Sequence, residues 1–152
     1  MQLVKVAACS KEDEYVQDLV HAAYPQASVT HVARVEDDKR IIPDGAITLY
    51  YPIPMDMLHE ILNTTFWPSN GNQFGHGVYL TTRLRAFNNV DKVAVIVCRA
   101  VVNRNNVVLG CPGIVLQPGV VAVDRFLNPQ YVVFQHTNLI YPEYLAVFCP
   151  NA

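Results

Sequence analysis

The stretch Phe74-Gly75-His76-Gly77-Val78-Tyr79-Leu80 places two glycines directly before residues that favour a β-strand. Glycine has no Cβ, so this spacing allows a sharp turn and the close approach of another group to the backbone. It is not the dinucleotide-binding pattern Gly-x-Gly-x-x-Gly, because a third glycine and a strand-turn-helix context are both missing. A hairpin with two glycines is the alternative interpretation, so other parts of the chain must decide between them.

The composition is that of one globular domain. The chain has 152 residues, of which 51% are hydrophobic and 16% are charged, enough to bury a real core. We expect a single domain over residues 1–152, with no helical regulatory domain, because the chain begins only ten residues before its first predicted helix. The net charge of −2, with lysines and arginines scattered, gives no electrostatic footprint for nucleic acid.

Targeting and metal-binding signals are missing from the sequence. No apolar run is long enough for a signal peptide or a membrane-spanning helix, so we expect an intracellular, soluble protein without a membrane partner. The four cysteines lie far apart, without zinc-ligand spacing or a disulfide framework. We therefore expect buried free thiols and no metal.

Hydrophobic periodicity predicts an α+β domain with helices early and strands late. Ser10, followed by Asp13, predicts a capped amphipathic helix that ends near Tyr24-Pro25. The apolar run Val93–Val102 predicts a central strand buried on both faces. A further helix is predicted over 55–62, and shorter strands over 28–35, 47–51, 77–81, 113–116, 120–123, 131–135 and 144–148, with Pro52 and Pro54 stopping the second of these strands.

Six segments, in this order, resemble the signature of the poly(ADP-ribose) polymerase (PARP) catalytic domain. They are Phe74–Leu80, Val93–Val102, Pro112-Gly113-Ile114-Val115-Leu116, Val123-Asp124-Arg125, Asn128-Pro129-Gln130-Tyr131-Val132-Val133-Phe134 and Leu139-Ile140-Tyr141-Pro142-Glu143-Tyr144-Leu145. The likeness extends over roughly residues 11–149. It implies an ADP-ribosyltransferase fold with two abutting small antiparallel sheets and peripheral helices, and it implies NAD in a cleft between the sheets.

The resemblance also implies which residues occupy the family's catalytic positions. The family uses a histidine that orients a ribose hydroxyl, a tyrosine under the nicotinamide and a glutamate that offsets positive charge on the ribose. Here Tyr51, Tyr79 and Gln130 stand at these positions, so only the tyrosine is retained. Tyr51 is longer than histidine and would fill the adenosine-ribose subsite, whereas Gln130 keeps hydrogen-bonding reach without a charge.

The implied NAD contacts are altered as well. The positions concerned are Pro52, Gly77, Tyr79 and Phe87. Pro52 replaces a glycine whose N–H and C=O normally bind the nicotinamide carboxamide, and proline has no N–H to donate. Phe87 or Val90 is the nearest candidate for the position of the family's second stacking tyrosine, and Phe87 is equally a core residue. Arg83 and Arg85 could meet a pyrophosphate or form a solvated face.

Three functions remain open from the sequence. The favoured one is a pseudoenzyme that binds NAD weakly or not at all and acts as a binding or interaction module, because orientation, amide recognition and charge stabilisation are lost together. The second is a divergent mono-ADP-ribosyltransferase that transfers ADP-ribose from NAD to a protein or nucleic-acid acceptor, but not a polymerase. The third is an unrelated small β-rich binding domain.

Overall fold

A computed structural model describes residues 2–36, 41–64, 66, 73–85 and 91–151. In chain order the elements are β1 (Gln2–Lys5), α1 (Lys11–Ala23), β2 (Ser28–Glu36), β3 (Ile47–Ile53), η1 (Met55–Met57), α2 (Leu58–Thr64), β4 (Val78–Thr81), β5 (Val93–Ala100), η2 (Arg104–Asn106), β6 (Val107–Leu109), β7 (Val121–Val123), β8 (Tyr131–Phe134), η3 (Thr137–Leu139) and β9 (Ile140–Cys149). Among the described residues no helix is long and apolar enough to cross a membrane.

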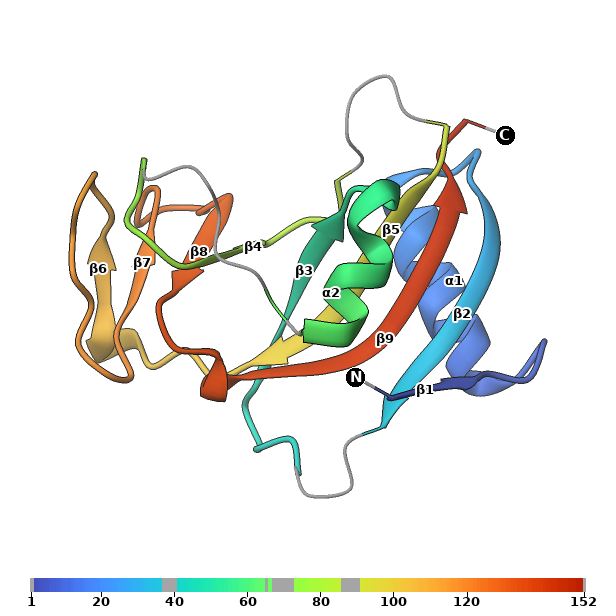
Figure 1. The fold of residues 1–152 in the computed structure, drawn as a ribbon, viewed down its shortest axis with the longest axis horizontal. Helices are drawn as coiled ribbons and strands as arrows, with labels where there is room; N and C mark the ends of the chain where they lie inside the picture. Colours follow the sequence, from blue (N-terminus) through green and yellow to red (C-terminus); the bar gives the residue numbers. More distant parts are fainter. Residues whose placement is uncertain (1, 37–40, 65, 67–72, 86–90, 152) are drawn as a thin grey trace.

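The described strands form one sheet with a helix on each face. Their order is β1-β2-β9-β5-β3-β4-β8-β7-β6. Figure 1 shows α2 in front of the sheet and α1 behind it, both over the half that contains β5 and β9. The other half, formed by β4 and β8 to β6, extends to the left and has no α-helix of its own in the described part of the chain, only the short 3-10 turns η2 and η3.

Strand β5 separates two hydrophobic cores. Side chains alternate along a strand, so Val95 and Val97 pack with Val16 and Val20 of α1, whereas Ile96 belongs to the core beneath α2. All residues of β5 are buried except Arg99, which is half-buried. The predicted central strand with two buried faces is therefore confirmed.

The cysteine of this strand is sealed inside the second core. Cys98 is fully buried, and this burial, followed by the nearby Glu143 charge, raises the pKa of its thiol far above the ordinary value. A thiol in such surroundings stays protonated and unreactive.

The first helix begins where the sequence indicates. The Ser10 hydroxyl accepts a hydrogen bond from the Asp13 N–H at 3.2 Å, and the Asp13 carboxylate accepts one from the Cys9 N–H at 3.0 Å. The first bond satisfies a backbone donor that a helix start leaves unpaired, and the second ties the residue before the N-cap to the first turn. The predicted capped helix is confirmed, and it ends at Ala23.

The expectation of two separate antiparallel sheets is wrong. The two halves join through one register pair, Tyr50 with Thr81, between β3 and β4. This narrow contact is enough to make a single nine-stranded sheet of the described strands. The sheet is also mixed, because β6 and β7 run parallel.

Strand β3 continues through Pro52 to Ile53, although the sequence predicts that Pro52 ends it. The Thr81 hydroxyl lies 3.3 Å from the Tyr50 carbonyl oxygen, so the backbone groups of Tyr50 face β4. Backbone groups two residues apart on a strand point the same way, so the nitrogen of Pro52 also faces β4, beyond the last paired position. The pairing of Pro52 with Val95 on β5 therefore requires no N–H from the proline.

The strand predicted over 144–148 is longer than expected, because β9 begins at Ile140 and ends at Cys149. The other differences involve short segments. The predicted strand over 113–116 is wrong, because Gly113 lies in a turn with φ of 78° and the Leu116 N–H binds the Gln135 side chain at 2.7 Å. The sequence gives no signal for β1 or β6, which have only four and three residues. The predicted helix over 55–62 begins with the 3-10 turn η1 and extends to Thr64.

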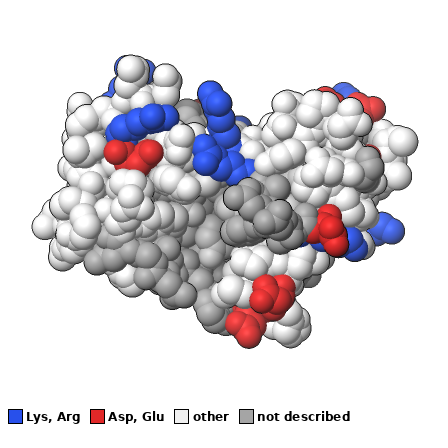
Figure 2. Space-filling view, turned by 90° about the horizontal axis from the view of Figure 1, so that it is seen from above, with Lys and Arg blue, Asp and Glu red and all other residues white. Residues whose placement is uncertain are grey.

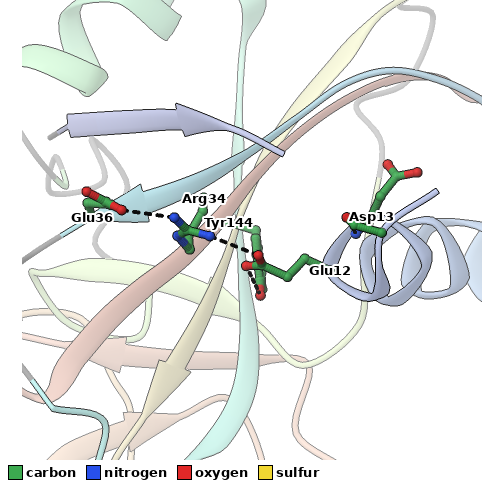
Figure 3. Close-up of polar contacts among 6 residues, drawn as sticks. Glu12, Asp13, Arg34, Glu36 and Tyr144 are labelled. Carbon is green, nitrogen blue, oxygen red and sulfur yellow. Dashed lines mark hydrogen bonds and ion pairs between the residues drawn. The ribbon is translucent and has the colours of Figure 1, made fainter. Parts of the chain in front are cut away.

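A polar network fastens α1 to the sheet (Figure 3). The Glu12 carboxylate accepts hydrogen bonds from Arg34 of β2 at 2.8 Å and from the Tyr144 hydroxyl of β9 at 2.9 Å. Arg34 also donates to Glu36 at 3.0 Å. Because the side chains of Arg34 and Glu12 are more than a third exposed, water screens their charges and this ion pair contributes only modestly to stability.

We expect Glu12→Ala to lower the free energy of unfolding by about 1 kcal/mol, because it removes two charge-assisted hydrogen bonds between α1 and the sheet. Glu14→Ala is the matched control, since Glu14 lies in the same first turn and is exposed. Urea denaturation of both variants measures the difference. Equal losses would mean that only the helix dipole is affected.

Glu143 of β9 is a half-buried carboxylate. Burial raises its pKa, the nearby Arg99 lowers it and Glu12 raises it again, with a net upward shift. A carboxyl group whose pKa is raised on folding stabilises the protein below its unfolded-state pKa of about 4.3, and this contribution is lost as the pH rises through the folded-state pKa.

We therefore expect Glu143→Gln to stabilise the protein at pH 7 relative to the wild type and to have no such effect near pH 3.5. Thermal unfolding across this pH range measures the gain. A gain that is equally large at both pH values would contradict the assignment to the Glu143 charge.

Candidate functional site

The three predicted catalytic positions lie on neighbouring segments at the junction of the two halves of the sheet. Tyr51 is on β3, Tyr79 on β4, and Gln130 directly precedes β8. Strand β4 pairs with both β3 and β8, and the Gln130 carbonyl accepts a hydrogen bond from the Thr82 N–H at 3.1 Å. The fold thus brings these backbones together, although the side chains point to different places.

Tyr51 is a core residue. Its side chain is only 8% exposed and lies edge-on to Phe66, with ring centroids 5.1 Å apart. It shares the core beneath α2 with Leu49, Ile53 and Leu80. The ring therefore fills the interior on the α2 face of the sheet.

Tyr79 points to the opposite face of β4. Leu80 packs in the core with Tyr51, so the preceding side chain must project from the other side of the strand. There, Tyr79 packs against the cluster of Leu116, Ala122 and Val133. Tyr51 and Tyr79 consequently do not face a common space.

The Tyr79 hydroxyl is engaged by the loop that precedes its own strand. It donates a hydrogen bond to the Gly75 carbonyl at 2.5 Å and accepts one from the Phe74 N–H at 3.0 Å. A phenol has one proton to donate, and here it is used within the protein. This hydroxyl holds the loop of residues 74–77 against β4.

Gln130 closes a loop anchored by an acidic side chain. One carboxylate oxygen of Asp124 accepts hydrogen bonds from the backbone N–H groups of Gln130 at 2.9 Å and Tyr131 at 3.1 Å. These bonds fix the backbone on both sides of Gln130, whose side chain is half-buried. The Gln130 amide carries no charge, so it cannot stabilise a cation as a carboxylate does.

The four predicted NAD contacts have different surroundings. Pro52 lies on β3 where the pairing with β4 has ended, Gly77 lies against β8, and Tyr79 is described above. Phe87 is outside the described residues. A Cβ on Gly77 would lie 2.5 Å from the Phe134 carbonyl oxygen, so close backbone packing alone explains why glycine is needed there.

The structure adds two aromatic residues that the sequence analysis did not select. Phe74 stacks on Tyr131 with ring centroids 6.1 Å apart, and Tyr131 lies 6.3 Å from Tyr79. Tyr131 is opposite Thr81 in the register, on the same face as Tyr79. Strand alternation is enough to place Tyr131 on the same face as Tyr79. The stacking of Phe74 on Tyr131, in contrast, depends on the path of the loop of residues 74–77.

A hollow of about 720 Å³ lies away from this junction. It is lined by residues of β1, β2, β9, α1, η1 and α2 and adjoining segments, and none of its lining residues belongs to β3, β4 or β8. Within the described ranges, no group of three or more His, Cys, Asp or Glu side chains is arranged to hold a metal ion.

The comparisons with known proteins identify the fold. No family model matches the chain, and no curated protein matches it significantly in sequence. Among solved structures, the PARP domain of Arabidopsis RADICAL-INDUCED CELL DEATH1 is similar, with a TM-score of 0.63 and 15% identity over 93% of this chain and 99% of that domain. Such a likeness shows the fold: the chain is an α+β protein with a PARP-like ADP-ribosyltransferase fold.

We expect Gly77→Ala to lower the free energy of unfolding by about 1–3 kcal/mol, because the added methyl group would collide with the backbone of β8. The neighbouring His76→Ala is the control, since His76 is exposed and its change should stay within about 0.5 kcal/mol. Chemical denaturation measures both. A Gly77→Ala variant as stable as the wild type would show that β8 can move away.

Proposed function

We propose that this chain is a domain of PARP-like fold that has lost ADP-ribosyl transfer and acts as a binding or interaction module. The observation that supports this most strongly is the separation of Tyr51 and Tyr79. Tyr51 is buried with Phe66 beneath α2, whereas Tyr79 packs on the opposite face of β4. Transfer chemistry needs groups that converge on one substrate, because positioning supplies much of the rate enhancement.

The chemistry of the substituted residues supports the same proposal. Cleavage of the nicotinamide–ribose bond develops positive charge on the ribose, and the neutral amide of Gln130 offers no counter-charge to it. The nitrogen of Pro52 faces the end of the β3–β4 pairing, where a glycine would present an N–H to a carboxamide. Charge stabilisation and amide recognition are thus weakened by covalent structure.

The alternative is a mono-ADP-ribosyltransferase that uses an acceptor carboxylate in place of the missing glutamate. The adjacency of β3, β4 and the residue before β8 favours it, since these segments hold Tyr51, Tyr79 and Gln130. In this case the protein would transfer a single ADP-ribose unit, with NAD as its co-substrate.

Incubation with radiolabelled NAD distinguishes the two functions. We expect the wild-type protein, offered carboxylate-rich protein acceptors and single-stranded DNA or RNA, to incorporate no more label than a heat-unfolded sample. We also expect NAD to leave its Tm unchanged, because a ligand that binds the folded state would raise it.

The control variants test whether any signal arises at this site. Label that disappears in Gln130→Ala, with an unchanged Tm for that variant, would overturn the pseudoenzyme proposal. The triple variant Tyr51→His, Pro52→Gly, Gln130→Glu restores the family's residues, and a rise in Tm with NAD in this variant alone would support their role in binding.

A further inference from the structure

Two large apolar side chains project from the loop between β7 and β8. Phe126 is 67% exposed and Leu127 is 80% exposed, and they are adjacent in the sequence. Single exposed apolar residues are common on protein surfaces and carry no argument by themselves. The construction of this loop, residues 124–130, distinguishes the pair.

The Phe126 loop, as we call residues 124–130, is held at three places. Asp124 binds the backbone at the far end of the loop, as described above. The Arg125 guanidinium donates to the Asn128 carbonyl at 3.0 Å, and the Thr82 hydroxyl donates to the Pro129 carbonyl at 2.7 Å. A loop fixed in this way presents its apolar side chains with little ordering cost on binding.

Three arginines belong to the loop or to the segment that lies beside it. Arg125 belongs to it, and the two hydrogen bonds from Thr82 to Pro129 and Gln130 bring the segment with Arg83 and Arg85 beside it. All three arginines are exposed, and none has an ion-pair partner among the described residues. In the view of Figure 2, two groups of basic side chains lie near one another on the left and centre of the molecule.

The charges of the chain are distributed unevenly between its halves. Residues 73–85 and 101–139 contain four arginines and one acidic residue, Asp124, whose carboxylate already accepts two backbone hydrogen bonds. In contrast, residues 2–36 contain five acidic residues and three basic ones. The positive half therefore stands out in a chain whose net charge is −2.

We propose that the Phe126 loop, with Arg83 and Arg85, is the docking surface for a partner protein segment that carries apolar side chains next to carboxylates. Apolar anchors give such a contact its affinity, and the arginines select the acidic flanks and speed association. A nucleic acid fits less well, because three arginines neutralise few phosphates and Leu127 offers no aromatic face for a base. This inference rests on the proposed function as a binding module.

Selection from a random dodecapeptide library displayed on phage, with the whole chain as bait, tests this surface. We expect the enriched peptides to combine Asp or Glu with Leu, Phe or another large apolar residue. Synthetic copies of these peptides are then titrated by fluorescence anisotropy. We expect binding to weaken at least tenfold when the apolar residues are replaced by Ser, and also when the acids are replaced by amides.

Variants of the protein locate the contact. The double variant Phe126→Ser, Leu127→Ser should weaken binding at least tenfold, and so should Arg83→Gln, Arg85→Gln. Both should keep the wild-type Tm, because these side chains are exposed. The matched controls are Ile41→Ser, which is 90% exposed, and Arg104→Gln, which precedes β6 at the opposite end of the β6–β7 pair; both should bind like the wild type.

Several results would overturn the inference. They are a selection without an acidic and apolar bias, peptides whose affinity is unchanged in the two double variants, or self-association that the Phe126→Ser, Leu127→Ser variant abolishes. The inference would also be wrong if an oligonucleotide displaced the peptides and its own binding did not depend on Phe126 and Leu127. Peptides that bind elsewhere on the chain overturn this surface but leave the proposed function as a binding module standing. NAD-dependent labelling that Gln130→Ala abolishes would instead overturn the proposed function, and it is measured in a separate assay.

Discussion

The contact of Thr81 with Tyr50 determines how the two halves of the molecule are joined. Thr81 is the buried polar residue of the described core, only 4% exposed, and its hydroxyl lies 2.7 Å from the Arg83 carbonyl and 3.3 Å from the Tyr50 carbonyl. A buried hydroxyl needs a hydrogen-bond partner, and the Thr81 hydroxyl has one in β3 and one in the segment that follows β4. Strand β4 lies between β3 and β8 in the sheet. The loop of residues 74–77 leads into β4, and the Phe126 loop, which ends at Gln130, leads into β8.

The parts of the fold that the sequence predicts are those set by local chemistry. Ser10 and Asp13 lie three residues apart and cap the start of one helix. The continuous apolar composition of Val93–Val102 predicts a strand that is buried on both faces. The prediction that Pro52 ends the strand is wrong. A strand can contain a proline where the proline nitrogen has no hydrogen-bond partner to lose, and this depends on the register with β4 and β5. The pairing of Tyr50 with Thr81 makes one sheet of strands that would otherwise form two.

The candidate site follows the same division. Tyr79 and Gln130 lie on adjacent segments because β4 pairs with β8. The surroundings of each side chain are not predictable from the sequence, because the Tyr51 ring packs against Phe66 and the Tyr79 hydroxyl donates a hydrogen bond to the Gly75 carbonyl. Both contacts depend on loops whose path no local pattern specifies.

Because Cys98 is buried in the sheet, the labelling of its thiol reports on the opening of the sheet. Contrary to the expectation of buried thiols, Cys9 and Cys111 are exposed, so a thiol-specific reagent reaches them in the folded protein. Cys98, in contrast, is fully buried on β5 between β3 and β9. Modification of Cys98 requires β5 to separate from a neighbouring strand or the cover of α2 to lift. The rate at which this thiol is labelled therefore measures how often the centre of the domain opens, independently of any ligand or activity.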